Sequence, residues 1–487
     1  MLYKALIEEH INKQEDRVAV IYQEEEYSYK ELNDLVAAFG NGLTSLGINK
    51  GDRIIITCNN SIDMVVSILA SIALGIIFVP LPHDISKSRL EYIQNDCKAK
   101  LIINNRYRKR GTASGDNMCC LKDVINVSAE SNFHREIVDI NEGLYIIYTS
   151  GTTNKPKGVF ACQKQALFVA NAINGCLRNS VDDIILCRIP LSFDYGLYQL
   201  LMTCLSGAKL LLLDEQVMIQ SIPQMIKKYN VTALPVVPAM LNILIKSRVF
   251  ERVDVPSVRY ISSTGDVLSV GLIKQTEQQL PHVEVIPMYG LTECKRVSIM
   301  PYGMKEKKYK GSCGIPLPGV SVRLVNEHDG VGELEVIGPN VMEGYWNDSV
   351  ETEKFYSVEE GERVLKTGDL FKIDEDGYLY FQGREKAFIK HNGYRINNLE
   401  LEEIVASIDN VMENAVVGIN GSDAGEDIVC VISLNDMTKE AQIRKDCIKS
   451  LGGIKVKHFI FTDEPLPKNF NGKVDRKLIK SNIEARR

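Results

Sequence analysis

The chain has 487 residues, of which 45% are hydrophobic and 25% are charged, so it contains enough apolar side chains to bury a large core. Its formal net charge is −6, with acidic and basic residues interspersed, which gives no basic footprint for binding nucleic acid. Because this length exceeds what one hydrophobic core usually supports, we expect two or more domains.

The cysteines and histidines favour no metal or disulfide framework. The twelve cysteines form no Cys-x-x-Cys pair, and the seven histidines form no pair at metal-ligand spacing, so we expect no zinc site. No signal peptide is recognisable in the sequence, and scattered cysteines of this kind are typical of reduced thiols. We therefore expect a cytoplasmic protein.

One apolar run near the N-terminus imitates a membrane span. Residues 64–81 carry no charge and are long enough to be considered for one. Gly75 divides the run, however, into a helical first half and a β-branched second half that ends at Pro80. A buried helix followed by a central strand explains this pattern better than lipid does, so we expect no membrane association.

A loop rich in hydroxyl groups, residues 148–158, follows the apolar run 144–147 and precedes a helix expected to begin near Gln163. Its glycines would let backbone N–H groups approach a ligand, and its Ser and Thr hydroxyls add donors. This combination suits the oxygens of a polyphosphate. The loop is not a Walker A sequence, and an ordinary polar connection is the alternative.

Apolar strands alternate with helical patterns over most of the chain, which predicts parallel sheets covered on both faces by helices. From Val320, short strands with turn signals indicate a smaller β-rich section. The last hundred or so residues have strand and helix patterns of their own, including a helix over residues 399–405. We therefore expect an α/β protein with a large domain, residues 1–384, that contains the β-rich subdomain, and a small α+β domain, residues 385–487.

Three further stretches carry reactive side chains, and each has an ordinary alternative. Residues 289–293 place an aromatic ring, a hydroxyl and a carboxylate after the apolar run 283–288, where ligands bind in open α/β sheets, but they could form a simple turn. Asp369, in Thr367-Gly368-Asp369, could face a ribose diol or close a tight turn. Residues 467–476 could present Lys473 on a glycine-flanked loop or form a solvated basic tail.

Together, these stretches resemble the AMP-forming acyl/aminoacyl-adenylating superfamily, which includes acyl-CoA synthetases, nonribosomal-peptide adenylation domains and luciferases. The resemblance covers nearly the whole chain in the family's order. The matching segments are residues 148–158, 289–293, 311–319, 367–369, 383–384, 389–396 and 472–473.

The resemblance implies a two-step reaction that uses ATP and Mg²⁺. A carboxylate attacks the α-phosphorus of ATP, which releases pyrophosphate and leaves an acyl adenylate, and a thiol then displaces AMP to give a thioester. A carboxylate is a poor nucleophile toward an anionic phosphate, so positioning and charge neutralisation must carry most of the catalysis.

The resemblance also implies the roles of individual residues. Glu293 would bind Mg²⁺ and Thr292 the α-phosphate, and Lys473 would bridge the substrate carboxylate and the α-phosphate. Tyr289 would lie against adenine, and Asp369, assisted by Arg384, would bind the ribose hydroxyls. The full set of expected nucleotide contacts is Thr149, Ser150, Gly151, Thr152, Thr153, Lys157, Gly265, Tyr289, Gly290, Asp369 and Arg384.

In this family the small domain is mobile and rotates between the two half-reactions. Lys386 stands at the position of the hinge residue, where an exposed turn residue is the alternative. After rotation, a loop containing Lys390, Gly393 and Tyr394 would replace Lys473 at the active site and help to form the path of the thiol.

The acyl group would be bound near Phe193, Asp194 and Tyr198. In amino-acid-activating relatives an Asp at this place pairs with the substrate ammonium, whereas here Asp194 could instead cap the next helix. Leu291 stands where peptide-synthetase domains usually have Pro, and Ser263-Thr264-Gly265-Asp266 stands where Gly-Gly-Glu is common. Because of these departures, an amino acid and another small carboxylic acid remain alternative substrates.

Three functions follow from the sequence. The favoured one is a ligase that loads an amino or other small carboxylic acid onto the phosphopantetheine thiol of a carrier protein on a separate chain, because residues 472–477 resemble the ending of carrier-loading domains. The second is an AMP-forming acyl-CoA ligase for an aliphatic or aromatic acid. The third, a nucleotide-binding module without turnover, is disfavoured by the joint presence of Lys157, Glu293, Asp369 and Lys473.

Overall fold

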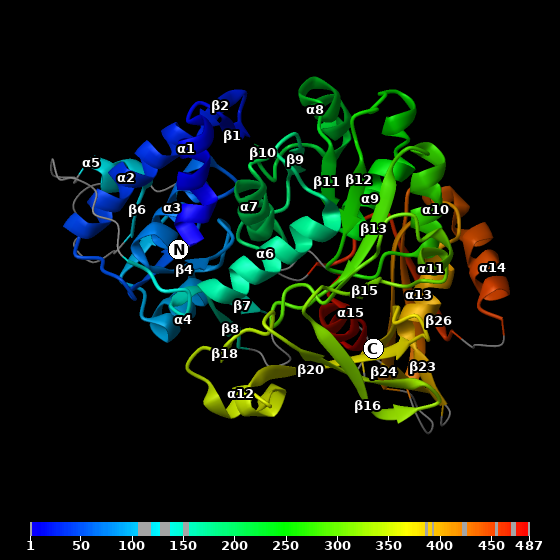
Figure 1. The fold of residues 1–487 in the computed structure, drawn as a ribbon. Helices are drawn as coiled ribbons and strands as arrows, with labels where there is room; N and C mark the ends of the chain where they lie inside the picture. The colour runs from blue at the N-terminus through cyan, green and yellow to red at the C-terminus, as the bar shows by residue number, and fades with distance from the viewer. Residues whose placement is uncertain are drawn as a thin grey trace.

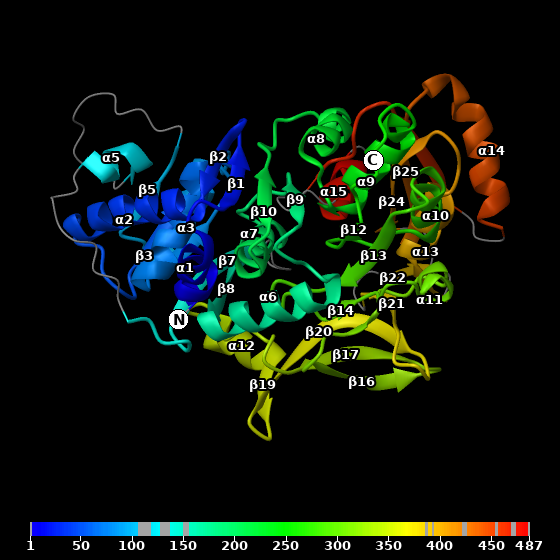
Figure 2. The same ribbon diagram turned by 45° about the horizontal axis from the view of Figure 1, so that its top comes forward.

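The structure is a computed structural model that describes residues 2–105, 118–126, 137–149, 155–384, 388–391, 394–420, 426–452, 456–468 and 474–485. Two large sheets lie in the N-terminal part, and a smaller antiparallel sheet, drawn in yellow and yellow-green, lies below them in Figure 1. The C-terminal elements, drawn in orange and red, lie beside the larger of these two sheets, which has nine strands, in both ribbon views (Figures 1 and 2).

The first large sheet has seven strands in the order β18-β8-β7-β4-β3-β5-β6. Strands β6, β5, β3, β4 and β7 run parallel to one another, β8 is antiparallel to β7, and β18 is antiparallel to β8. The strands are β3 (Arg53–Ile56), β4 (Ile77–Pro80), β5 (Leu101–Ile103), β6 (Met118–Cys119), β7 (Gly143–Thr149), β8 (Lys157–Cys162) and β18 (Gly344–Tyr345).

The uncharged run 64–81 forms a buried helix and a buried central strand, as predicted. Helix α3 (Ile62–Leu74) ends at Gly75, whose φ of 67° is left-handed, and β4 follows. None of the helices in the described part of the chain has the length and apolarity that crossing a bilayer demands.

The second large sheet has nine strands in the order β15-β14-β13-β12-β11-β9-β10-β1-β2. Its inner strands are parallel, which confirms the predicted α/β class. The strands are β1 (Val18–Tyr22), β2 (Glu25–Ser28), β9 (Ile184–Cys187), β10 (Lys209–Leu212), β11 (Ala233–Val236), β12 (Tyr260–Ser263), β13 (Glu284–Tyr289), β14 (Ser298–Ile299) and β15 (Ile315–Pro316).

Helices cover both large sheets, and α6 (Gln163–Leu177) and α7 (Asp194–Ser206) lie between them (Figures 1 and 2). Helix α6 begins at Gln163 as predicted, but β8 intervenes, so the hydroxyl-rich loop joins two antiparallel strands rather than a strand and a helix. The remaining helices of this part are η1 (Lys4–Glu8), α1 (Glu9–Gln14), α2 (Tyr29–Ser45), α4 (Lys87–Cys97), α5 (Leu121–Asn126), η2 (Ile219–Ser221), α8 (Ile222–Tyr229), α9 (Pro238–Lys246), η3 (Val249–Glu251), α10 (Val270–Gln279), α11 (Lys305–Tyr309) and α12 (Ser349–Phe355).

The β-rich section predicted from Val320 onward is a five-stranded antiparallel sheet. Its strands are β16 (Ser321–His328), β17 (Val331–Ile337), β19 (Tyr356–Glu359), β20 (Glu362–Ile373) and β21 (Leu379–Arg384). Asp369 of β20 pairs with Arg384 of β21 in the register of this sheet. The tight-turn alternative for residues 367–369 is therefore wrong, because these residues lie within β20.

The C-terminal section has hydrophobic clusters of its own, one of which includes Ile389, Leu401, Val405 and Ile432. Helix α13, which contains the predicted helix 399–405, packs there with the strands. The elements are β22 (Phe388–His391), β23 (Tyr394–Asn397), α13 (Asn398–Ala406), β24 (Val411–Asn420), β25 (Glu426–Leu434), η5 (Met437–Lys439), α14 (Glu440–Ser450), β26 (His458–Thr462) and α15 (Arg476–Glu484).

This section contacts α9 of the large section through the start of β24. Asn242 Nδ2 donates a hydrogen bond to the carbonyl of Met412 at 2.8 Å, and Lys246 Nζ donates to the carbonyl of Val411. The predicted boundary between residues 384 and 385 stays a prediction, because residues 385–387 lie outside the described residues.

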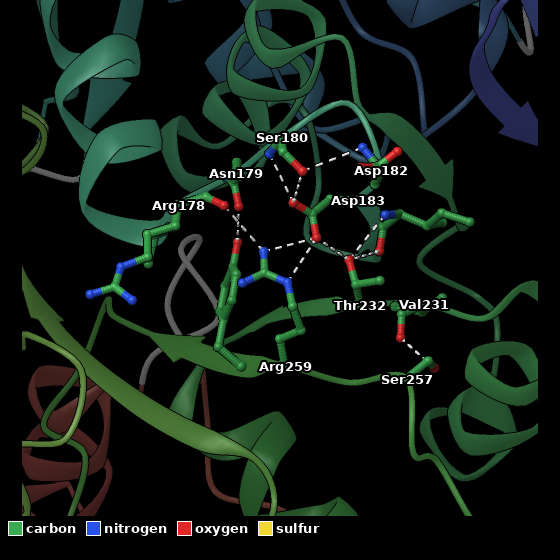
Figure 3. Close-up of polar contacts among 12 residues, drawn as sticks. Arg178, Asn179, Ser180, Asp182, Asp183, Val231, Thr232, Ser257 and Arg259 are labelled. Atoms are coloured by element: carbon green, nitrogen blue, oxygen red, sulfur yellow. Dashed lines mark hydrogen bonds and ion pairs between the residues drawn. The ribbon is translucent and has the colours of Figure 1, made fainter.

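A buried carboxylate joins three neighbouring strands of the nine-stranded sheet at the ends where they begin (Figure 3). Asp183, directly before β9, has a side chain only 3% exposed. It accepts hydrogen bonds from Thr232 Oγ1 before β11 at 2.6 Å, from Arg259 Nη2 before β12 at 2.8 Å, and from the backbone N–H of Ser180 at 2.8 Å. One carboxylate therefore accepts hydrogen bonds from the segments that precede β9, β11 and β12.

Replacing Asp183 by Ala should lower the free energy of unfolding by about 3 kcal/mol, because the change removes the buried acceptor shared by Ser180, Thr232 and Arg259. The neighbouring Asp182 is exposed, so Asp182→Ala should change stability by less than about 0.5 kcal/mol. Urea unfolding followed by tryptophan fluorescence or circular dichroism measures both variants. Equal stability of the two would contradict the role given to Asp183.

Candidate active site

The end of β13 meets the five-stranded sheet through a hydrogen bond between two predicted nucleotide-binding residues. Tyr289 donates its hydroxyl to Asp369 Oδ2 at 2.7 Å, and its ring packs on Phe371 at a centroid distance of 4.6 Å. Burial raises the pKa of Tyr289 well above its ordinary value, and the charge of Asp369 raises it further, so the phenol stays protonated as a donor.

Asp369 is itself buried and accepts from a second side chain. Arg384 Nε donates to Asp369 Oδ1 at 2.7 Å, whereas 56% of the Arg384 side chain is exposed. The structure thus brings together Tyr289, Asp369 and Arg384, which the sequence separates by up to about a hundred positions. Each oxygen of the Asp369 carboxylate accepts one hydrogen bond and can accept another.

The loop that follows Tyr289 directs two more predicted residues toward different elements. Thr292 Oγ1 donates to Asp194 Oδ2 at 3.0 Å, and Asp194 is the first residue of α7. Glu293 Oε1 accepts from the hydroxyl of Tyr345 in β18 at 3.0 Å. This loop therefore connects the nine-stranded sheet with the seven-stranded sheet and with α7.

Lys157 approaches the same tyrosine from another side. It opens β8, its Nζ pairs with Glu351 of α12, and it lies 5.3 Å from the centre of the Tyr345 ring. The pairing with Lys157 holds the pKa of Glu351 below its ordinary value, with Lys354 adding to the effect. Tyr345, which sequence analysis did not identify, links the predicted phosphate-binding lysine with the predicted magnesium-binding carboxylate.

A close backbone contact shapes the loop. A Cβ atom on Gly290 would lie 1.7 Å from the carbonyl oxygen of Lys295, so only glycine fits at this position. The N–H of Val297 donates to the carbonyl of Tyr289 at 2.9 Å and closes the loop. Lys295 adopts a left-handed conformation with φ of 57°, which is uncommon for a residue with a side chain.

The predicted acyl-binding residues lie at the start of α7. Phe193 occupies the N-cap position and Asp194 the first turn, so the alternative in which Asp194 caps the helix is wrong. Tyr198 is buried, and its hydroxyl lies 3.1 Å from that of Tyr145. Lys295 Nζ lies over both rings, 5.0 Å from Tyr145 and 5.5 Å from Tyr198, and 3.5 Å from Asp194 Oδ2.

Several predicted residues are not part of this geometry. Thr149 ends β7 and donates weakly, at 3.5 Å, to the carbonyl of Lys157, and Gly265 follows β12 with a left-handed φ of 95°. Outside the described residues lie Ser150, Gly151, Thr152, Thr153, Lys386, Gly393, Lys473 and the side chains of Lys390 and Tyr394.

Two family models match the chain. The model described as AMP-binding enzyme matches residues 7–346, and the model described as AMP-binding enzyme C-terminal domain matches residues 400–473. Together they include Lys157, Thr292 and Glu293 in the first range and Lys473 in the second.

Two kinds of relative are similar over nearly the whole chain. A plipastatin synthase polypeptide of Bacillus subtilis is 28% identical over 485 residues, which are 95% of this chain and 19% of that polypeptide. 4-Coumarate–CoA ligase 3 of Arabidopsis thaliana is 28% identical over 489 residues, which are 94% of this chain and 86% of that enzyme. The chain thus spans about a fifth of the synthase polypeptide and most of the ligase.

Solved structures share the fold. o-Succinylbenzoate CoA synthetase (MenE) of Bacillus subtilis, in complex with its acyl-adenylate intermediate, has a TM-score of 0.86 at 24% identity over 98% of both chains. ATP-bound MatB of Rhodopseudomonas palustris has a TM-score of 0.88 at 24% identity over 99% of this chain and 98% of that one. At 24% identity, this similarity shows the fold alone.

The contact between Gly290 and Lys295 predicts a sharp difference between two glycine substitutions. Gly290→Ala should displace the loop and lower ATP affinity at least about tenfold, since Thr292 and Glu293 move with it. Gly271→Ala, in α10, meets open space and should leave affinity unchanged. Isothermal titration with ATP measures both, and a Gly290→Ala protein that binds ATP normally would contradict the geometry.

Proposed function

Since the chain belongs to the AMP-binding enzyme family, we propose that it is an AMP-forming acid–thiol ligase. In the first half-reaction a substrate carboxylate attacks the α-phosphorus of ATP, so that an acyl–phosphate bond forms and pyrophosphate leaves. In the second, a thiol attacks the acyl carbon, a thioester forms, and AMP leaves with the electrons of the broken bond.

The observation that carries this proposal is the convergence of side chains on Tyr289, the last residue of β13, and on the loop after it. Tyr289 contacts Asp369 across 80 positions, Thr292 contacts Asp194 across 98, and Glu293 contacts Tyr345 across 52. The residues to which we assign ribose, phosphate and acyl binding are thus linked to one short segment. Such fixed positioning is what an adenylation reaction requires.

In the proposed reaction, Asp369 accepts hydrogen bonds from the ribose hydroxyls while Tyr289 and Arg384 hold its orientation. Lys157 and the hydroxyl-rich loop bind the β- and γ-phosphates, and Thr292 binds the α-phosphate. The carboxylate of Glu293 suits Mg²⁺, which usually takes one or two protein carboxylates and completes its shell with water and phosphate oxygens. Held by Glu293, Mg²⁺ would supply positive charge to neutralise the phosphates.

We assign residues 1–384 to a large domain and residues 385–487 to a small domain that rotates about Lys386. In the adenylating arrangement Lys473 bridges the substrate carboxylate and the α-phosphate. After rotation, the segment of Lys390, Gly393 and Tyr394 takes its place beside the thiol. The separate hydrophobic clusters of the C-terminal section support this division.

We assign the phosphopantetheine thiol of a discrete carrier protein as the acceptor. The similarity to peptide synthases supports this assignment. CoA, which carries the same thiol arm, is the second candidate, because the chain matches 86% of a 4-coumarate–CoA ligase. We place the reaction in the cytoplasm, and the twelve free cysteines suit a reducing compartment.

Pyrophosphate exchange tests the first half-reaction. With a panel of amino, aromatic, aliphatic and dicarboxylic acids, at least one acid should support ATP–pyrophosphate exchange, and chelation of Mg²⁺ should abolish it reversibly. Transfer to a phosphopantetheinylated carrier protein or to CoA then identifies the acceptor. Binding of ATP without exchange by any acid would instead favour a nucleotide-binding module.

The two half-reactions should separate in Lys473→Ala. This variant should lose adenylation by a factor of about 100 or more but retain thioester formation from supplied acyl adenylate, because Lys473 is displaced in the second step. Lys477→Ala, four positions along the same segment, is the matched control and should keep both activities. Equal loss of both steps in Lys473→Ala would contradict the rotation.

A further inference from the structure

Two neighbouring cations, Lys295 and Arg296, are buried on the loop that carries Thr292 and Glu293. The Lys295 side chain is 4% exposed, and Arg296 as a residue is 7% exposed. Burial lowers the pKa of both groups, and the negative charge of Asp194 opposes this shift in each. Asp194 therefore lies within electrostatic reach of both cations.

Lys295 already has an anionic partner within the chain. Its Nζ lies 3.5 Å from Asp194 Oδ2, which also accepts a hydrogen bond from Thr292. The faces of the Tyr145 and Tyr198 rings add cation–π attraction. Asp194 thus has a charge partner without any substrate, and the physical reason for assigning a substrate ammonium to it is lost.

Arg296 has no such partner among the described residues. Its Nη1 donates to Thr264 Oγ1 at 2.6 Å, and the guanidinium lies 5.4 Å from the centre of the Tyr195 ring. The buried Nε has no acceptor in the described part of the chain, where no carboxylate comes within ion-pair distance of this guanidinium either. A guanidinium keeps its charge in proteins, and a buried charge without a counter-ion is costly.

A ligand that brings an anion next to Arg296 would offset the free-energy cost of this buried charge. A carboxylate matches the planar fork of a guanidinium, which can donate two parallel hydrogen bonds to it. The reacting carboxyl of the substrate belongs near Thr292 in the proposed function, and Thr292 and Arg296 have different partners: Thr292 contacts Asp194, whereas Arg296 contacts Thr264 and the Tyr195 ring. An anion at Arg296 would therefore be a second group of the same substrate.

We propose that Arg296 binds a second carboxylate of the acid substrate, so that the enzyme activates one carboxyl of a dicarboxylic acid rather than an α-amino acid held by Asp194. This inference rests on the proposed function and specifies its substrate class. Arg296 is the specificity-determining residue, and Lys295 is a positioning residue that balances the charge of Asp194.

Pyrophosphate exchange with matched acids tests the inference in the wild-type enzyme. Succinate is compared with butanoate, glutarate with pentanoate, and phthalate with benzoate, and L-alanine represents the amino acids. The diacid of at least one pair should be preferred by about 30-fold or more in kcat/KM. Preference for the monoacid in every pair, or for the amino acid, would overturn the inference while leaving the ligase function intact.

Variants of Arg296 then show whether this residue makes the distinction. Arg296→Met should lower kcat/KM for the preferred diacid about 100-fold and change that for the paired monoacid less than about threefold. Arg296→Lys, which keeps the charge but loses the fork, should recover part of the preference. The exposed Arg252, replaced by Met, is the matched control and should behave as wild type.

Two further measurements separate this role from others. The KM for ATP should not change in Arg296→Met, because the second carboxylate is distinct from the nucleotide. Equal loss for monoacids and diacids, or a raised KM for ATP, would assign Arg296 to the scaffold or to nucleotide binding and refute the inference. Absence of exchange with every acid would refute the ligase function itself and the inference with it.

Discussion

The candidate site depends on one close backbone contact, between Gly290 and the carbonyl of Lys295. A side chain at position 290 would occupy the space of that oxygen, so the loop can fold back on itself only because the residue is glycine. The fold-back holds Lys295 in the left-handed region, a conformation that costs on the order of 1 kcal/mol or more for a residue with a side chain. The surrounding contacts must offset this strain.

Those contacts come from three sheets. Tyr289, at the end of β13, donates a hydrogen bond to Asp369 of the five-stranded sheet, and Glu293 in the loop accepts one from Tyr345 of the seven-stranded sheet. Strand β13 itself belongs to the nine-stranded sheet. The opposite end of β13 is also fixed, because the fully buried Lys308 binds Glu284 at 2.7 Å and Glu277 of α10 at 2.5 Å. A strand held at both ends can present side chains in fixed positions, which favours catalysis by positioning.

The sequence predicted the parts of this structure that arise from local patterns. Apolar runs became buried strands, Gly75 divided a helix from a strand, and α6 began at Gln163, because these features depend on residues within one or two turns. The antiparallel β8 was missed because its six residues lie directly before the helix and carry no turn signal of their own. Tyr345 was missed because its role comes from Lys157 and Glu293, which are distant in sequence.

The interpretation of Asp194 shows why distant partners matter more than residue type. A carboxylate at the start of α7 suggests an ammonium-binding group as long as its surroundings are unknown. The surroundings contain Lys295, which a glycine five residues earlier turns inward, so the carboxylate is neutralised by the chain itself. Because Asp194 is paired with Lys295, the guanidinium of Arg296 is the buried charge that requires a partner. A buried cation selects an anion as strongly as a buried carboxylate selects a cation. The charge of the substrate group that the acyl site accepts therefore depends on the conformation of this loop, which residue identities alone do not reveal.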